Sequence, residues 1–215
     1  MRILLCAATE FEIQPTLDIL SQQKENNVEV LITGIGMMET TYRLTKQLAI
    51  SRPEMMIQAG IAGALNSDIA LGETVIVEKE TIGDMGVVES NEFKPVFKMG
   101  LTVDSGSLPW KNGWLVNESS MLDRFDLKKV AAISVNEIST SKDRIDYYKS
   151  IGGEIESMEG AAFHYCALQE NIPFIQLRSI SNEIGERDKS KWKMKESIAS
   201  LNKEIQSIIT KLNRP

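Results

Sequence analysis

The feature that most constrains the fold of this chain is an alternation of strand-like segments, glycine turns and helix-like segments. Residues 2–8, 28–33 and 55–59 are predicted strands, and the last two run into Gly34-Ile35-Gly36 and Gly60-Ile61-Ala62-Gly63. Strands that alternate with helices in this way form a mostly parallel sheet covered on both faces. The alternation predicts an α/β fold, a three-layer sandwich with a central, mostly parallel mixed sheet flanked by helices.

The rest of the chain continues this pattern. Further strands are predicted at residues 73–80, 130–135 and 174–180, and helices at 11–24, 38–51, 141–150, 158–170 and 192–212. Pro15 is expected in the first turn of the first helix, where its missing N–H costs least. Residues 83–113 are rich in Gly, Ser, Asn and Pro, and they predict a long excursion from the core that serves as a lid or a subunit contact.

Length and composition narrow the class of protein. With 215 residues and 42% hydrophobic side chains, residues 1–215 are predicted to form one domain. The 24 basic and 30 acidic side chains include no Lys/Arg tract, which argues against a nucleic-acid partner. No run approaches the roughly 20 apolar residues of a membrane helix, and Cys6 and Cys166 suggest neither a metal site nor a disulfide framework. We expect a cytoplasmic protein with no membrane association.

Polar side chains are few at the ends of the predicted strands, which is where ligands of open parallel sheets bind. Glu10 and Glu12 follow the first strand, the glycines around Ile61 follow the third, and Asn182 follows the last. Glu159 precedes the penultimate helix. Carboxylates, an amide and a glycine-lined floor suit cleavage of a glycosidic bond, where water loses a proton and a sugar cation must be stabilised.

Each of these residues also has a purely structural explanation. Glutamates in a first helical turn interact favourably with the helix dipole, Ser157 is a plausible N-cap, and Asn182 fits an ordinary loop. The glycines need do no more than close tight turns. His164, the only histidine, lies in a helical segment and is expected to be structural, which argues against a histidine-based triad. Single residues therefore leave the function open.

The ordered set of motifs is more specific than any one of them. The set comprises Ala7 to Glu12, Thr33 to Gly36, Gln58 to Leu65, Glu156 to Ala161 and Asn171 to Asn182. From residue 1 to about 190, this set resembles the nucleoside phosphorylase and nucleosidase superfamily. Within it the chain is similar to the methylthioadenosine/S-adenosylhomocysteine nucleosidases and, more closely, to the futalosine hydrolases, through Glu156 to Gly160 and Ser181 to Asp188.

The resemblance implies a function. It implies hydrolysis of the N-glycosidic bond of futalosine, which releases hypoxanthine and dehypoxanthine futalosine in menaquinone biosynthesis. Two alternatives stay open, namely a nucleosidase of the methylthioadenosine/S-adenosylhomocysteine type and a non-catalytic nucleoside-binding module on the same fold. The family further implies no metal, no cofactor, and a homo-oligomer in which residues 83–113 lie at or near a neighbour's site.

The resemblance also implies a role for each matching residue. Glu12 falls at the position of the water-activating carboxylate, and Arg178 at that of a basic residue that helps to hold the water. Glu159 falls where a carboxylate grips the ribose hydroxyls. The remaining substrate-binding positions are Met158 against the sugar, Gly60 and Ile61 in the floor, Ile138 over the base, and Ser139, whose main chain binds the edge of the base.

Two departures from the family pattern bear on the chemistry. Phosphate-using relatives carry an arginine where this chain has Gln58, so the resemblance favours hydrolysis over phosphorolysis. The adenosine-type nucleosidases carry an aspartate where this chain has Asn182, whose amide can donate a hydrogen bond to O6 of a 6-oxopurine and assist the leaving base. Arg187, five residues further on, is expected to bind the benzoate carboxylate of futalosine.

Overall fold

The computed structural model describes residues 1–23, 27–90, 92–100 and 109–213, so the predicted end of the first helix at residue 24 and parts of the excursion lie outside the described residues. In chain order the elements are β1 (Ile3–Ala7), α1 (Glu10–Ser21), β2 (Val28–Ile32), α2 (Met37–Ile50), β3 (Met55–Ala64), β4 (Thr74–Ile82), β5 (Gly86–Glu89), β6 (Glu92–Pro95), η1 (Val96–Lys98), β7 (Trp110–Lys111), β8 (Trp114–Val116), η2 (Ser120–Arg124), β9 (Lys129–Ser134), α3 (Lys142–Ser150), β10 (Ile155–Ser157), α4 (Gly160–Gln169), β11 (Phe174–Glu183), η3 (Lys189–Lys191) and α5 (Met194–Asn213). Within these ranges no helix has the length and apolar character that a membrane crossing requires.

One mixed sheet organises the molecule. Its strands follow the order β2-β1-β3-β10-β9-β4-β8-β7, and β11 pairs with both β3 and β4. Strand β1 runs parallel to β2 and β3, β11 parallel to β3, and β9 parallel to β4 and β10. Strand β10 pairs antiparallel with β3, and β8 pairs antiparallel with β4. Because β3, β10, β9, β4 and β11 pair in a cycle, the centre of the sheet curls toward a barrel.

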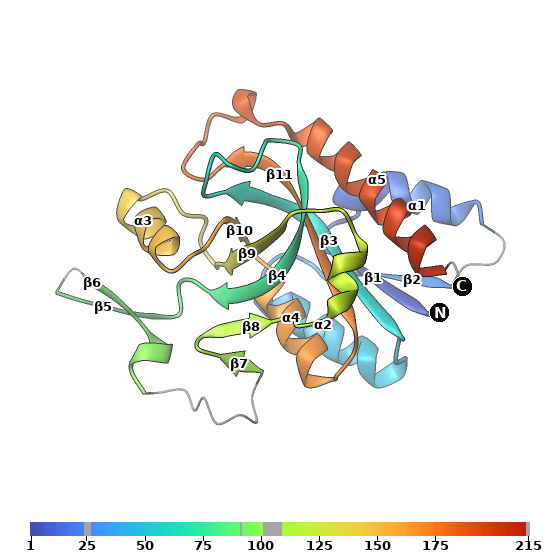
Figure 1. Cartoon of the computed structure of the whole chain (residues 1–215), viewed down its shortest axis with the longest axis horizontal. Helices are drawn as coiled ribbons and strands as arrows, with labels where there is room; N and C mark the ends of the chain where they lie inside the picture. The colour runs from blue at the N-terminus through green and yellow to red at the C-terminus, as the bar shows by residue number, and fades with distance from the viewer. Residues whose placement is uncertain (24–26, 91, 101–108, 214–215) are drawn as a thin grey trace.

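Helices cover both faces of this sheet, as Figure 1 shows. Ile3, Leu5 and Ala7 of β1 pack in one hydrophobic cluster with residues of α1 and α5, whereas Leu4 and Cys6 pack in another with residues of α2 and α4. Successive side chains of a strand point to opposite faces, so a strand buried on both sides must be apolar throughout. The predicted α/β sandwich with a mostly parallel mixed sheet is confirmed.

Two predicted boundaries are wrong. Strand β3 does not stop before the glycines but continues to Ala64, because its glycine-containing half pairs with β11 on one side and β10 on the other. Strand β10 itself was not expected, since its three residues Ile155–Ser157 lack the length for a clear pattern. The helix predicted at 158–170 accordingly begins later, at Gly160.

Pro15 lies in the second turn of α1, not in the first turn as expected, because the helix begins already at Glu10. A proline inside a helix disturbs its hydrogen-bond ladder. Asn202 of α5 inserts its side-chain amide there: Nδ2 donates to the carbonyl oxygen of Glu12 at 2.9 Å, and Oδ1 accepts from the N–H of Thr16 at 3.0 Å. The Asn202 side chain therefore provides hydrogen-bond partners for the main-chain groups of the opened turn, and it links α1 to α5 at Glu12.

Asn202→Leu should lower the free energy of unfolding by about 1–3 kcal/mol, because the Glu12 carbonyl and the Thr16 N–H would be buried without partners. Urea denaturation measures the change. Lys203→Leu, at the exposed neighbouring position of α5, controls for the altered side-chain type. Equal losses in both variants would show that the amide of Asn202 does not stabilise the opened turn.

Candidate active site

A cavity of about 310 Å³ lies at the carboxyl ends of β1 and β11 and along the glycine-containing half of β3. The side chains around it fall into a polar group and an apolar group. The polar group includes Thr9, Glu12, Glu156, Glu159, Asn182 and Arg187, and the apolar group includes Phe11, Ile35, Ile61, Ile138, Met158, Ile184, Trp192 and Met194. The expectation that the strand-end carboxylates and the amide meet in one place is confirmed for Glu12, Glu159 and Asn182.

Glu12 is held by three donors at the start of α1. Its Oε2 accepts from the N–H and the hydroxyl of Thr9, both at 3.1 Å, in a capping-box arrangement in which Thr9 is the N-cap. Its Oε1 accepts from the N–H of Ile61 at 3.1 Å. Burial raises the pKa of Glu12, and the charge of Arg178 opposes that rise. The carboxylate is therefore both oriented and more basic than one in water.

Arg178 projects from β11 beneath the two carboxylates and is 1% exposed. Its Nη1 lies 3.4 Å from Oε2 of Glu159 and 3.5 Å from the carbonyl oxygen of Ile61. Its Nη2 donates to Oε1 of Gln58 at 3.2 Å. The guanidinium balances the buried negative charge of the site, and Gln58 holds it from below rather than lining the cavity.

Glu159 occupies the N-cap position of α4 and contacts a glycine turn across the cavity. Its Oε1 accepts from the N–H of Gly36 at 3.1 Å. Gly36 has a φ of 87°, a conformation that side-chain-bearing residues rarely adopt. The turn after β2 therefore requires glycine here in order to aim its N–H at Glu159.

Gly60 allows neighbouring side chains to approach the backbone closely, and it is not part of a turn. It lies within β3, and a Cβ atom at this position would stand 2.3 Å from Nη1 of Arg178 and 3.1 Å from Oε1 of Glu12. Neither group has room to move within the hydrogen bonds described above. The absent side chain thus lets the guanidinium and the carboxylate pack directly on the sheet.

A buried network lies beneath the start of α4. Glu80 of β4 accepts from Nε2 of Gln176 at 2.8 Å and from Oγ of Ser134 at 3.1 Å. The same Ser134 oxygen accepts from the N–H of Ala161 in the first turn of α4, and a Cβ at Gly160 would stand 1.7 Å from Oε1 of Glu80. Burial raises the pKa of Glu80 to about 7. This network anchors the helix end that carries Glu159.

The far side of the cavity carries side chains suited to contact a nucleobase. Asn182 donates from Nδ2 to the carbonyl oxygen of Glu183 at 2.9 Å and accepts at Oδ1 from Ser181 at 2.8 Å, which leaves one N–H free to donate. Ile138 is 41% exposed at the cavity edge. Glu156, in contrast, is 4% exposed, and its Oε1 accepts from the N–H of Ser139 at 3.0 Å. Burial raises the pKa of Glu156, whereas the hydrogen bonds from Ser139 lower it.

Most of the catalytic and substrate-binding residues expected from the sequence line the cavity, and three lie behind it. The lining residues are Glu12, Met158, Glu159, Ile61, Ile138, Asn182 and Arg187. Arg178 and Gly60 support the carboxylates from below, and the main-chain N–H of Ser139, expected at the edge of the base, is occupied by Glu156. Arg187 lies with its guanidinium 5.5 Å from the centre of the Trp192 ring. The roles of these residues stay predictions.

Several lining residues were not singled out from the sequence. Glu156 lies in the motif from Glu156 to Ala161, three residues before Glu159, and the three residues of β10 are too few for an alternating pattern to show which face of the sheet its side chain occupies. Phe11, Ile35, Trp192 and Met194 carry no such signal, because exposed apolar residues are common on protein surfaces. His164 is fully buried, and burial lowers its pKa to about 3, so the ring stays neutral as a structural residue.

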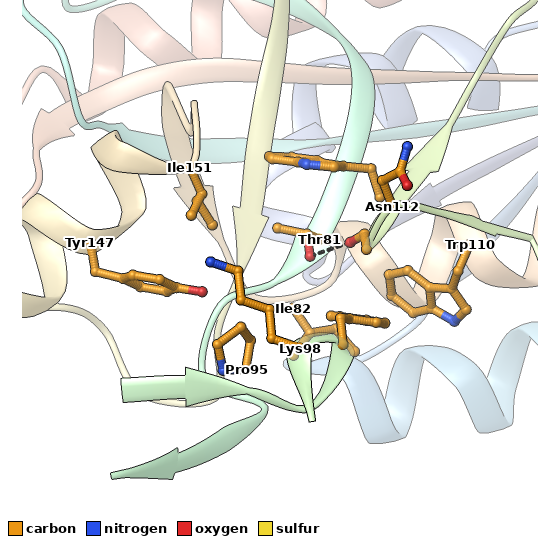
Figure 2. A pocket seen from close by; sticks show the side chains of 11 residues that line it. Thr81, Ile82, Pro95, Lys98, Trp110, Asn112, Tyr147 and Ile151 are labelled. Carbon is orange, nitrogen blue, oxygen red and sulfur yellow. Dashed lines mark hydrogen bonds between the residues drawn. The ribbon is translucent and has the colours of Figure 1, made fainter. Parts of the chain in front are cut away.

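A second cavity, of about 270 Å³, lies on the excursion, between the β7–β8 hairpin, η1 and α3. Figure 2 shows Trp110, Tyr147 and Lys98 at its walls and the hydrogen bond from the Thr81 hydroxyl to the carbonyl oxygen of Gly113. Its described lining residues include no Asp, Glu, His or Cys. Of the two cavities, only the one containing Glu12 and Glu159 is lined by carboxylates.

Comparisons with known proteins agree with this fold. A family model described as Phosphorylase superfamily matches residues 19–214. A futalosine hydrolase of Thermus thermophilus is 29% identical over 182 residues, which are 83% of this chain and 80% of that protein. Among solved structures, a 5'-methylthioadenosine/S-adenosylhomocysteine nucleosidase of Helicobacter pylori has a TM-score of 0.80 at 18% identity, with 97% of each chain covered. The native futalosine hydrolase of the same organism has a TM-score of 0.79 at 19% identity, again with 97% of each chain covered.

Proposed function

The chain belongs to the phosphorylase superfamily, and from this we propose that it hydrolyses the N-glycosidic bond of futalosine, releasing hypoxanthine and dehypoxanthine futalosine for menaquinone biosynthesis. One observation carries the hydrolytic part. A carboxylate offers about four acceptor sites, and Glu12 uses three of them for protein donors. The fourth is left for a water molecule, and the raised pKa suits Glu12 to take a proton from it.

The proposed mechanism assigns one task to each side of the cavity. Glu12 removes a proton from water, which attacks the anomeric carbon as the bond to the base breaks. Glu159 accepts hydrogen bonds from the ribose hydroxyls and stabilises the positive charge that develops on the sugar. Asn182 donates to the departing base at its O6 and N7 edge. Arg178 pairs with Glu159 and keeps that carboxylate in place.

Water rather than phosphate is proposed as the nucleophile. The position that carries an arginine in phosphate-using relatives is Gln58, which is buried against Arg178. A neutral amide offers no charge to a phosphate dianion, and Arg178 is already engaged with Glu159, Gln58 and the Ile61 carbonyl. This arrangement supports hydrolysis.

The purified protein, incubated with futalosine, inosine and methylthioadenosine, should release hypoxanthine from futalosine fastest, at a rate independent of added phosphate. Chromatographic identification of the base and of the sugar product measures this. Release of adenine from methylthioadenosine as the main activity would favour a methylthioadenosine/S-adenosylhomocysteine-type nucleosidase. A sugar 1-phosphate product would overturn hydrolysis, and binding without turnover would indicate a non-catalytic nucleoside-binding module.

Asn182→Asp should reduce the preference for a 6-oxopurine over a 6-aminopurine. An ionised aspartate would repel O6, and a protonated one would donate to N7 of adenine while its other oxygen accepts from the 6-amino group. Exchange of a matched for a mismatched hydrogen bond should change the ratio of kcat/KM values by about one to two powers of ten. Futalosine and aminodeoxyfutalosine share the benzoate arm and provide the comparison. Equal loss on both substrates would remove Asn182 from base recognition.

The proposal extends to three features beyond the reacting bond. Arg187 is exposed at the cavity, so its guanidinium is accessible to the benzoate carboxylate. Apolar side chains on α1, α2 and the turn before α2 support assembly into a homo-oligomer, because Phe11, Ile35 and Met38 are 65%, 62% and 84% exposed. The free thiols of Cys6 and Cys166 agree with a cytoplasmic location.

A further inference from the structure

We propose that Glu80 is held as a neutral carboxylic acid and that, in this form, it is a positioning residue for Glu159. Glu80 acts through two hydrogen-bonded arms that reach α4 three residues apart, and Glu159 is the N-cap of that helix. The inference rests on the proposed function in one respect, that Glu159 binds the ribose. It concerns a buried carboxyl group that does not line the cavity and has no task in the proposed mechanism.

The first arm runs through Ser134 of β9. Its hydroxyl donates to Oε2 of Glu80 at 3.1 Å and accepts from the N–H of Ala161 at 2.8 Å. Ala161 directly follows Gly160, where a Cβ atom would stand 1.7 Å from Oε1 of Glu80. The carboxyl group therefore lies so close to the beginning of α4 that only glycine fits there.

The second arm runs through Gln176 of β11 to His164, three residues after Ala161 on α4. In the structure Nε2 of Gln176 donates to Oε1 of Glu80 at 2.8 Å. The other amide atom, Oε1, and Nε2 of His164 are both buried without a well-formed hydrogen bond. Gln176 is nevertheless the side-chain hydrogen-bond neighbour of His164. Buried polar atoms almost always have partners, so this contact contains a mismatch.

The donors and acceptors of the imidazole ring show how the mismatch is resolved. Nδ1 of His164 lies 3.3 Å from the carbonyl oxygen of Leu115. A carbonyl oxygen only accepts, so Nδ1 carries the proton, and Nε2 of the neutral ring is an acceptor. Nε2 then requires the NH₂ group of Gln176 as its donor. Rotation of the amide by about 180° provides that donor within nearly the same space.

The rotated amide determines the protonation state of Glu80. Oε1 of Gln176 then faces Oε1 of Glu80, and two acceptor oxygens form a hydrogen bond only if the carboxyl group carries a proton. With that proton, all hydrogen bonds of the network run in one direction, from the N–H of Ala161 through Ser134, Glu80, Gln176 and His164 to the carbonyl oxygen of Leu115. An ionised Glu80 would leave Nε2 of His164 unpaired.

Burial places the shared proton on the carboxyl group and not on the ring. The side chains of Glu80, Ser134, Gln176 and His164 are each 0% exposed. Burial raises the pKa of Glu80 to about 7 and lowers that of His164 to about 3. Arg178 of β11 favours ionisation of Glu80, and Glu159 opposes it. As the pH rises through the pKa of Glu80, the second arm should break and a negative charge should appear near Glu159.

Glu80→Gln tests the kinetic consequence, because an amide donates and accepts as a protonated carboxyl group does but cannot ionise. At pH 6, below the pKa of Glu80, the variant should cleave futalosine with a kcat/KM close to that of the wild type. Between pH 6 and pH 9 the wild type should lose roughly two- to tenfold relative to the variant, the effect of one neutral hydrogen bond. Glu80→Ala removes both arms and should raise KM at every pH. Glu78→Gln, at a half-buried site of the same strand, is the matched control and should follow the wild type.

Two spectroscopic measurements report the proton without any substrate. The infrared difference between the wild type and Glu80→Gln at pH 6 should contain the C=O stretch of a protonated carboxyl group. His164 is the only histidine, so ¹⁵N NMR of tag-free, histidine-labelled protein reports a single ring. That ring should carry a proton on Nδ1 and none on Nε2.

These measurements separate the inference from the proposed function. If futalosine is not cleaved, but the protonated-carboxyl band is present and inosine binding weakens from pH 6 to pH 9 in the wild type and not in Glu80→Gln, the inference stands and the proposed function fails. The band of an ionised carboxylate, or a ring protonated on both nitrogens, overturns the inference. So does a Glu80→Gln variant as impaired as Glu80→Ala, or one whose activity relative to the wild type does not change with pH.

Discussion

Glu12→Gln should reduce kcat about a hundredfold to ten-thousandfold, the range typical for loss of a general base. The amide has nearly the shape of the carboxylate, so the cavity and its ribose contacts should persist and nucleoside binding should remain measurable. Glutamine cannot take a proton from water, and it also offers one fewer acceptor to the donors of Thr9 and Ile61. Single-turnover kinetics and equilibrium titration with futalosine measure the two properties separately.

Glu10→Gln is the comparison for this experiment. Glu10 lies two residues away in the same helical turn, but it is exposed and does not line the cavity. Its substitution should leave turnover close to that of the wild type. Near-normal turnover in Glu12→Gln, or a greater loss in Glu10→Gln, would assign the base to another residue.

Arg178→Met should lower the free energy of unfolding by about 3–5 kcal/mol, the typical cost of removing one partner from a buried ion pair. Glu159 would lose its buried cation, which lies 3.4 Å away, and Gln58 would lose a donor. Arg43→Met is the control, because Arg43 pairs with Glu39 at the surface, where both side chains are more than half exposed. That variant should lose no more than about 1 kcal/mol. Comparable urea midpoints for the two variants would contradict the structural role of Arg178.

The same Arg178→Met variant should show a shifted pH dependence. Glu12 acts in its ionised form, so activity falls as the pH drops through its pKa. Burial already raises that pKa, and Arg178 is the strongest influence that lowers it. Removing the guanidinium raises the pKa of Glu12 further, so the acid limb of kcat/KM should move to higher pH. The folded fraction of the variant, measured at each pH, separates this shift from unfolding.

The periodicity of the sequence was enough to predict the long helices and strands and the type of sheet. Strands buried on both faces, such as β1, read as continuous apolar runs, and the final helix shows one apolar stripe. The three-residue β10 and the second half of β3 escaped prediction. Their strand conformation depends on pairing with β9 and β11, distant in sequence, rather than on local preference.

For the candidate site too, the sequence determined some features and the tertiary structure determined others. By itself the sequence determined that carboxylates and an amide follow the strand ends. The residue types of Glu12, Glu159 and Asn182 fix their functional groups, and their positions relative to the predicted strands fix where they lie. Only the tertiary structure decided what surrounds each group: Asn202 closing the turn opened by Pro15, and Gly60 admitting Arg178 beneath Glu12. Burial and hydrogen-bond partners set whether a carboxylate is basic, paired or available, and they arise from contacts between residues up to 190 positions apart.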